Sequence, residues 1–196
     1  KATIDSVEYT LLFDLVANRG VAAVGFTLEK PQDIIIDFRR TELVTGVRMF
    51  DSNESVEYSL CNEHIVIPES ETRAGRQGFS IDFNVDNQSL NRRDEFLYTL
   101  LVPERARTLF PCFDQPDIKA HYRLSLAIPE EWEAVSNTPV TTPEYDAESW
   151  YDLDFGHTLP EGMKIVSFAR TEPLSTYLFS FVAGEFEART YDDGHH

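Results

Sequence analysis

The stretch Ala106-Arg-Thr-Leu-Phe-Pro-Cys-Phe-Asp-Gln-Pro-Asp-Ile-Lys-Ala120 combines an arginine, a cysteine, two aspartates, a lysine and two prolines between two strand-like runs. Asp residues at turns accept hydrogen bonds from backbone N–H groups, and proline fixes the turn. We therefore interpret this stretch, called the corner below, as a buried polar turn. Our hypothesis is that Arg107, Asp114 and Lys119 form a partly buried network of ion pairs and hydrogen bonds there.

Outward from the corner, apolar and polar residues alternate, which is typical of half-buried antiparallel strands. The clearest alternating runs are Val7–Leu15, Val24–Leu28, Phe79–Val85 and Tyr122–Ile128. The continuous apolar run Ile34–Ile36 favours a strand covered on both faces. Further predicted strands are Val44–Phe50, Val56–Leu60, Ile65–Ile67, Phe96–Val102, Tyr151–Phe155, Ile165–Phe168 and Tyr177–Val182.

Turn residues separate these runs, for example at Asn18–Gly20, Lys30–Asp33 and Ala74–Gly78, and no segment keeps a helical period over three turns. Many short strands with frequent turns indicate an all-β sandwich or barrel. We expect residues 1–193 to form a single β domain. Residues 194–196 would be a tail, and its His195-His196 pair is either native sequence or the remnant of a tag.

The net charge of −17 excludes nucleic acid as a favoured partner, because an acidic surface repels phosphate backbones. No apolar run has the length of a membrane span. Two cysteines, Cys61 and Cys112, cannot make a disulfide framework, although one bridge is possible. The chain opens at Lys1 without a methionine, which indicates an excised piece and favours an exported bacterial protein.

No residue set of the chain forms a self-contained active site. The histidines lack the His-Glu-x-x-His spacing of zinc hydrolases, so no metal ligand is predicted. A Gly-x-Ser-x-Gly elbow and a phosphate-binding glycine loop are both absent from the sequence. Cys112 lies between Pro111 and Phe113, a setting that favours a buried, inert thiol over a nucleophile. The residues alone therefore predict neither catalysis nor a cofactor.

The corner resembles the signature of the N-terminal domain of M1-family zinc aminopeptidases, Ala-Arg-x-x-Phe-Pro-Cys-x-Asp-x-Pro-x-x-Lys-Ala. The residues that carry the match are Arg107, Cys112, Asp114, Pro116 and Lys119 together with their apolar neighbours. Beyond the corner, Tyr9–Leu15 is similar to the family's opening strand, Ser136–Pro139 to its Ser-Asn-x-Pro turn, and Gly184–Phe186 to its closing segment.

The resemblance implies a saddle-like, mostly antiparallel β-sandwich that packs on a thermolysin-like domain absent from these residues. That second domain would hold zinc, and the parent protein would remove N-terminal residues from peptides. The chain itself would be non-catalytic and would shape one wall of the substrate cleft. The alternative is a stand-alone or degenerate β-sandwich module that binds peptide or a protein partner without hydrolysis.

One departure from the family concerns that cleft wall. Many members carry Gln and Glu seven and five residues before the signature arginine, and these positions are Leu100 and Val102 here. The resemblance places Tyr98, Leu100 and Val102 at the substrate cleft. Leu and Val cannot accept a hydrogen bond from a substrate ammonium group. Either the parent has a more hydrophobic pocket for the first residue, or it is a degenerate member.

Overall fold

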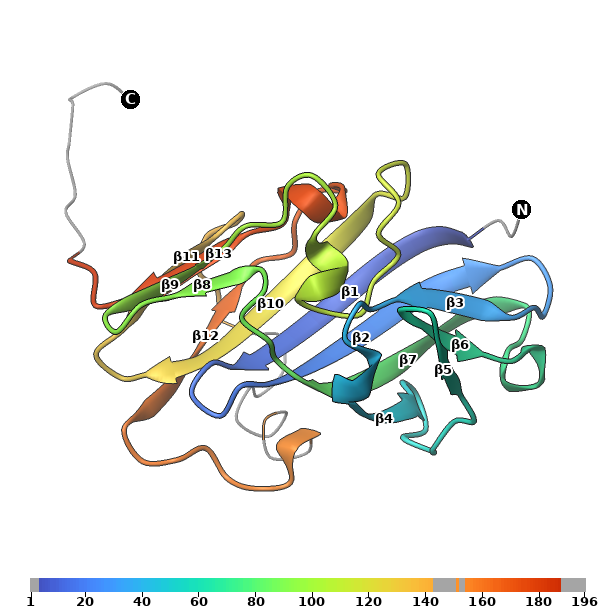
Figure 1. Cartoon of the computed structure of the whole chain (residues 1–196), viewed down its shortest axis with the longest axis horizontal. Coiled ribbons are helices and arrows are strands. Elements are labelled where there is room, and N and C mark those ends of the chain that lie inside the picture. Colours follow the sequence, from blue (N-terminus) through green and yellow to red (C-terminus); the bar gives the residue numbers. More distant parts are fainter. Residues whose placement is uncertain (1–3, 143–150, 152–153, 188–196) are drawn as a thin grey trace.

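The computed structural model describes residues 4–142, 151 and 154–187, and most of its regular secondary structure is β-strand (Figure 1). In chain order the strands are β1 (Ile4–Asp14), β2 (Arg19–Leu28), β3 (Ile34–Asp37), β4 (Val44–Met49), β5 (Ser59–Cys61), β6 (His64–Ile67), β7 (Gly75–Asn84), β8 (Leu90–Arg92), β9 (Phe96–Thr99), β10 (Ala120–Pro129), β11 (Glu133–Ser136), β12 (Met163–Phe168) and β13 (Phe181–Gly184). Short 3-10 turns lie at Thr41–Leu43, Glu69–Glu71, Ala106–Thr108 and Thr176–Leu178.

The strands form three sheets. A six-stranded sheet has the order β12-β10-β1-β2-β7-β4, a four-stranded sheet β11-β13-β9-β8, and a three-stranded sheet β3-β6-β5. Only β1 and β10 pair in parallel, whereas every other pairing among the described strands is antiparallel. The predicted all-β, mostly antiparallel sandwich is therefore confirmed.

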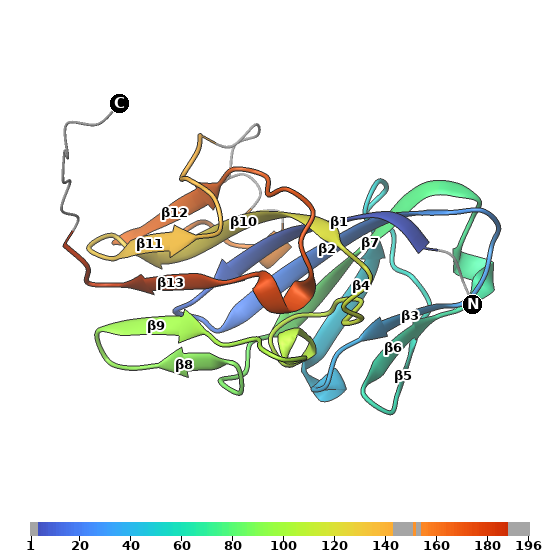
Figure 2. The ribbon, with the colours of Figure 1, turned by 90° about the horizontal axis from the view of Figure 1, so that it is seen from above.

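The two smaller sheets lie side by side over one face of the six-stranded sheet (Figure 2). Alternation along β1 directs Tyr9, Leu11 and Phe13 into the space between the layers. These side chains pack in one buried cluster with Leu97 of β9 and Ile36 of β3. The core thus joins all three sheets, and the corner lies between the two smaller ones (Figure 2).

The opposite, outer face of the six-stranded sheet is only partly covered. At one end, Leu12, Val21 and Ala127 form a second buried cluster with Tyr151 and Phe155. The prediction of a strand at Tyr151–Phe155 is wrong, because the described residues of that segment are helical. Tyr151 and Phe155 are four residues apart, so a helical turn directs both rings to the same face, onto the sheet.

The strands expected at Val56–Leu60 and Tyr177–Val182 begin only at Ser59 and Phe181, and a 3-10 turn occupies Thr176–Leu178. Two further expectations fail for reasons of sheet geometry. Ile35 is 53% exposed between the buried Ile34 and Ile36, because side chains alternate between the faces of a strand and β3 packs on the core with one face only. The turn predicted at Ala74–Gly78 is instead the start of β7, where Gly78 pairs with Gly25 of β2. These glycines allow two strands to approach closely rather than reverse the chain.

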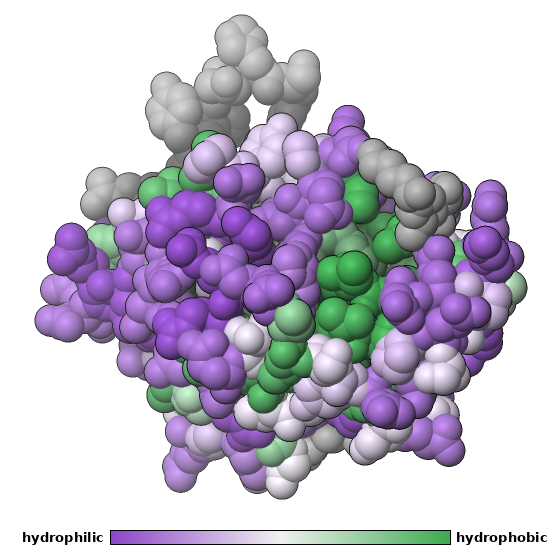
Figure 3. Space-filling view, turned by 45° about the vertical axis from the view of Figure 1, so that its right-hand side comes forward, coloured by the Kyte–Doolittle hydropathy of each residue, from purple (hydrophilic) through white to green (hydrophobic). Residues whose placement is uncertain are grey.

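The molecular surface is mostly hydrophilic on the face shown in Figure 3, as expected from the net charge of −17. Apolar residues on this face gather in a recess between hydrophilic surroundings (Figure 3). None of the helical segments in the described residues is long and apolar enough to cross a bilayer. The predicted tail at residues 194–196, with His195 and His196, lies outside the described residues.

Candidate functional site

The corner is fixed to the edge of the three-stranded sheet through backbone hydrogen bonds. Cys112 and Asp37 form an isolated antiparallel bridge, in which Asp37 N donates to Cys112 O at 2.8 Å and Cys112 N donates to Asp37 O at 3.1 Å. Arg39 N donates to the carbonyl of Arg107 at 2.8 Å. The corner therefore extends the three-stranded sheet beyond the end of β3.

The carboxylate of Asp37 is the main polar anchor of the corner, and sequence reasoning missed it. Its Oδ2 accepts hydrogen bonds from Asp114 N at 2.8 Å and Gln115 Nε2 at 2.9 Å, while Oδ1 lies 3.1 Å from His64 Nε2. Asp37 is 6% exposed. An acid directly after the apolar run Ile34–Ile36 was the available signal, because a buried carboxylate needs several donors.

The hypothesis of an ion network among Arg107, Asp114 and Lys119 is wrong in its ion pairs. Asp114 Oδ2 accepts from the backbone N–H of Arg107 at 3.2 Å, and Asp114 Oδ1 accepts from the Thr176 hydroxyl at 2.6 Å. The Arg107 guanidinium instead lies 3.7 Å from Glu63 Oε2, and Lys119 is exposed without an ion pair to any described residue. Neutral donors hold Asp114 in place, so both cations remain near water and avoid a desolvation cost.

Two further signature residues, Pro116 and Cys112, take part in the hydrogen bonding and packing of the corner. The carbonyl of Pro116 accepts a hydrogen bond from Ser175 Oγ at 2.9 Å, which ties the corner to the chain leading into β13. Cys112 is fully buried, and burial, with the nearby charges of Asp114 and Asp37, raises its thiol pKa well above the ordinary value. A thiol in that state does not form the reactive thiolate. Cys61 is exposed, and both cysteines are free.

Two tyrosines beneath the corner differ in the state of their hydroxyl groups. Tyr9 of β1 and Tyr122 of β10 are register partners whose rings stack with centroids 5.0 Å apart. The Tyr9 hydroxyl accepts a hydrogen bond from Phe113 N at 2.8 Å. The Tyr122 hydroxyl is buried and has no partner among the described residues. Only one of the two hydroxyl groups therefore holds the corner.

We expect Tyr9→Phe to lower the free energy of unfolding by about 1–3 kcal/mol, because it leaves the buried N–H of Phe113 without an acceptor. Tyr122→Phe should be neutral or stabilising by up to about 1 kcal/mol, since it removes a hydroxyl that is buried without a partner. Urea denaturation of both variants measures the difference. Both variants keep the stacked rings, so equal losses would contradict the assignment.

The residues predicted for the cleft wall lie together on the surface, at the end of β9. Tyr98, Leu100 and Val102 are 40%, 47% and 55% exposed. Across the four-stranded sheet, Tyr98 pairs with Val182 of β13, which pairs with Val135 of β11. Val135 is 60% exposed. Register partners share one face of a sheet, so Tyr98, Val182 and Val135 form an outward row, called the apolar row below.

Among residues 4–142, 151 and 154–187, no three His, Cys, Asp or Glu side chains gather in a way that could hold a metal ion. The Asp37 carboxylate is already engaged by three donors of the corner. The arrangement can therefore position a surface and stiffen it, and the described part of the corner supplies no donor set for catalytic zinc.

Comparison with known proteins agrees with this arrangement. Residues 20–178 match the family model of the peptidase M1 N-terminal domain. Glutamyl aminopeptidase of Mus musculus is 25% identical over 96% of this chain and 20% of its own length. Glutamyl aminopeptidase of Rattus norvegicus is 39% identical over 43% of this chain and 8% of its own length. Aminopeptidase N of Acetobacter pasteurianus is 40% identical over 42% of this chain and 20% of its own length.

The matched segments thus cover about a fifth or less of the length of these relatives. The family match includes the whole corner, and it covers most of the described strands. The resemblance inferred from the corner is therefore confirmed, and this chain belongs to the family of M1 peptidase N-terminal domains.

Proposed function

We propose that this chain is the non-catalytic N-terminal domain of a zinc metallo-aminopeptidase that removes N-terminal residues from peptides. The match to the peptidase M1 N-terminal domain supports this proposal. So do the printed names of the relatives, which are aminopeptidases longer than this chain. Zinc and the chemistry of hydrolysis would belong to a thermolysin-like domain of the parent.

The apolar row is the surface we assign to packing on that catalytic domain. Tyr98 and Val135 expose much of their side chains on one face of the four-stranded sheet, although the chain as a whole is strongly acidic. Contiguous exposed apolar residues on a charged protein are typical of protein–protein contacts. Leu100 and Val102 follow Tyr98 at two-residue steps, and we assign the cleft wall to these three residues, at the edge of the row.

The identity of these last two residues also supports a second candidate function. Leu100 and Val102 are apolar where many family members have Gln and Glu, so this wall offers no acceptor for a substrate amine. If the catalytic domain does not recognise the amine by itself, the parent is a degenerate member that binds peptide or a protein partner without hydrolysis.

The experiment is cleavage of aminoacyl-anilides and zinc content, measured on the full-length parent and on this chain alone. We expect activity only in the parent. The double variant Tyr98→Asp/Val135→Asp in the parent should lose roughly tenfold or more in kcat/KM, because it buries unpaired charge at the domain contact. Val140→Asp is the matched control, since Val140 is also 60% exposed but lies outside the row.

Activity in this chain alone, or equal effects of the row and control variants, would refute the proposal. A parent that binds peptide and lacks zinc and hydrolysis would support the degenerate module instead. Leu100→Gln refines the assignment of the wall. If Leu100 lines the cleft, restoring an acceptor should lower KM for substrates with a free amine and leave KM unchanged for N-acetylated analogues that bind as inhibitors.

A further inference from the structure

A hollow of about 350 Å³ lies on the outer face of the six-stranded sheet, where no helical segment of the described residues covers it. Its floor consists of residues without large side chains, among them Ala23 and Gly25 of β2 and Gly78 of β7. A Cβ atom on Gly78 would lie 2.7 Å from the carbonyl of Val24, too close for any side chain. The close pairing of β2 and β7 therefore requires glycine at position 78, so this part of the floor stays open whatever rotamers the neighbouring side chains adopt.

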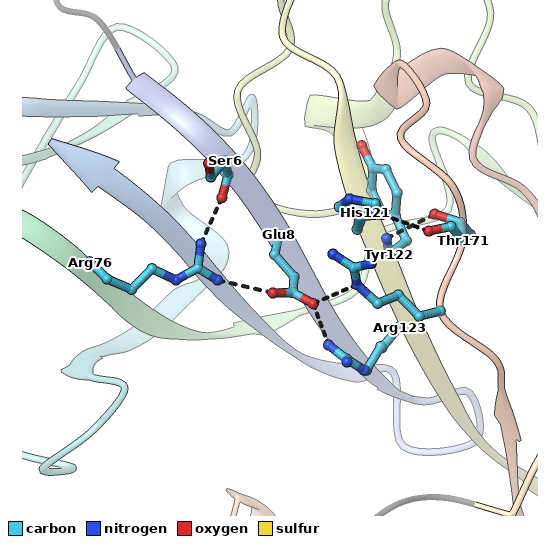
Figure 4. Close-up of polar contacts among 8 residues, drawn as sticks. Ser6, Glu8, Arg76, His121, Tyr122, Arg123 and Thr171 are labelled. Carbon is cyan, nitrogen blue, oxygen red and sulfur yellow. Dashed lines mark hydrogen bonds and ion pairs between the residues drawn. The ribbon is translucent and has the colours of Figure 1, made fainter.

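Arginines from three strands or loops converge on one carboxylate at the rim of this hollow (Figure 4). Glu8 Oε2 accepts from Arg76 Nη2 at 2.9 Å, while Oε1 accepts from Arg170 Nε at 3.0 Å and also from Arg123 Nη1. Burial raises the pKa of Glu8, but the hydrogen bond from Arg170 and the charge of Arg123 outweigh it and hold that pKa below its ordinary value. Glu8 is therefore ionised at neutral pH.

One carboxylate does not balance this cluster. Arg123 and Arg170 share a single oxygen of Glu8, so two like charges are held side by side. Among the described residues, the three guanidiniums have only one acceptor besides Glu8. It is the Ser6 carbonyl, which accepts from Arg76 Nη1 at 2.8 Å. A guanidinium carries several further N–H donors in a planar fork. Most donors of the cluster therefore remain open to a second anion.

The other wall of the hollow differs in chemistry. Phe50, which follows β4, lines the hollow and is 52% exposed. Beyond it, Arg73 and Asp51 pair with each other at 2.6 Å. Counting this pair, three arginines and two carboxylates line the hollow, and Arg170 adds a further positive charge on Glu8 from outside the lining, although the chain carries a net charge of −17. A local excess of positive charge beside an exposed aromatic ring is suited to an anion with an apolar body.

We propose that this hollow binds a small organic anion, with its acid group on Arg76 and Arg123 and its apolar body against Phe50. Guanidinium groups recognise the oxygens of phosphates and of carboxylates alike, so the shared chemistry is an acid group with at least two oxygens. The volume of the hollow lies at the small end of the range for ligand sites. The site is independent of the cleft wall, which lies on the four-stranded sheet.

The test is isothermal titration of this chain with phenyl phosphate, phenylacetate and inorganic phosphate at constant ionic strength. We expect saturable binding of at least one phenyl acid and weaker binding of inorganic phosphate, which cannot contact Phe50. Tighter binding of phenyl phosphate would identify a phosphate ligand, and tighter binding of phenylacetate a carboxylate ligand. Absence of saturation with all three probes would overturn the proposal.

Variants locate the binding. Arg76→Gln should raise the dissociation constant of the phenyl acid roughly tenfold, because it removes a charge-assisted contact. Arg39→Gln is the matched control, because the Arg39 side chain is 51% exposed against 52% for Arg76 and also pairs with one glutamate. Phe50→Ala should remove the preference for phenyl phosphate over inorganic phosphate without loss of folding, since Phe50 is exposed. Equal effects of the two arginine variants, or an unchanged preference in Phe50→Ala, would contradict the site.

Discussion

Replacing Phe110 by alanine lowers the free energy of unfolding by about 3–5 kcal/mol, the largest loss that we expect from a single change in the corner. Phe110 is fully buried. Its ring meets Tyr9, Tyr122 and Phe179 edge to face, at centroid distances of 6.0, 6.5 and 5.6 Å. Alanine would leave a cavity among three rings that belong to different parts of the chain and cannot collapse together.

Urea denaturation followed by tyrosine and tryptophan fluorescence measures this loss. Phe50→Ala is the matched control, because it removes the same ring from a position that is 52% exposed. Changes at exposed positions are usually worth within about 0.5 kcal/mol. A loss for Phe110→Ala no larger than that of the control would contradict the description of the corner as part of the core.

The second large effect concerns Asp37. Asp37→Ala should lower the free energy of unfolding by roughly 2–3 kcal/mol, because it removes the acceptor of the Asp114 N–H, the Gln115 amide and His64. The loss stays moderate because Gln115 is exposed and its side-chain amide can hydrogen-bond to water instead. The backbone bridge between Asp37 and Cys112 survives the substitution.

The control for Asp37 is Asp117→Ala, which removes an exposed carboxylate from the same corner. Thermal unfolding of both variants at neutral pH separates the role of a buried anchor from that of an exposed carboxylate. Asp37→Ala should melt clearly below the wild-type chain, and Asp117→Ala should melt close to it. If Asp117→Ala were the more damaging change, the anchor of the corner would have to be reassigned.

The strands were the most predictable part of the fold, because alternation is a local property of the sequence. The inward residues of β1, from Val7 to Phe13, and Leu15 directly after the strand are buried as the pattern predicts. Tyr151 and Phe155 escaped this reasoning because a spacing of four residues between apolar rings fits both a strand and a helical turn. The choice between strand and helical turn depends on tertiary contact, because both rings pack on the outer face of the sheet at Leu12 and Val21.

The site was less predictable than the strands because its partners are distant in sequence. The signature residues Cys112 and Asp114 could be recognised as a cluster, but the groups that hold them, Asp37 and Thr176, come from other elements. The cluster around Glu8 is similar, since its arginines at positions 76, 123 and 170 are spread along the chain. No local pattern marks residues that only the strand order brings together.

The parallel pairing of β1 with β10 has a consequence for how the chain is made. More than a hundred residues separate Val7 from its partner Ala120, so one edge of β1 has no neighbour until the ribosome has released β10. An unpaired strand edge is a template for association with other chains. Nascent or truncated forms that end before Ala120 should therefore aggregate more readily than the full chain, and mutual repulsion among the acidic residues spread along the chain would reduce this tendency.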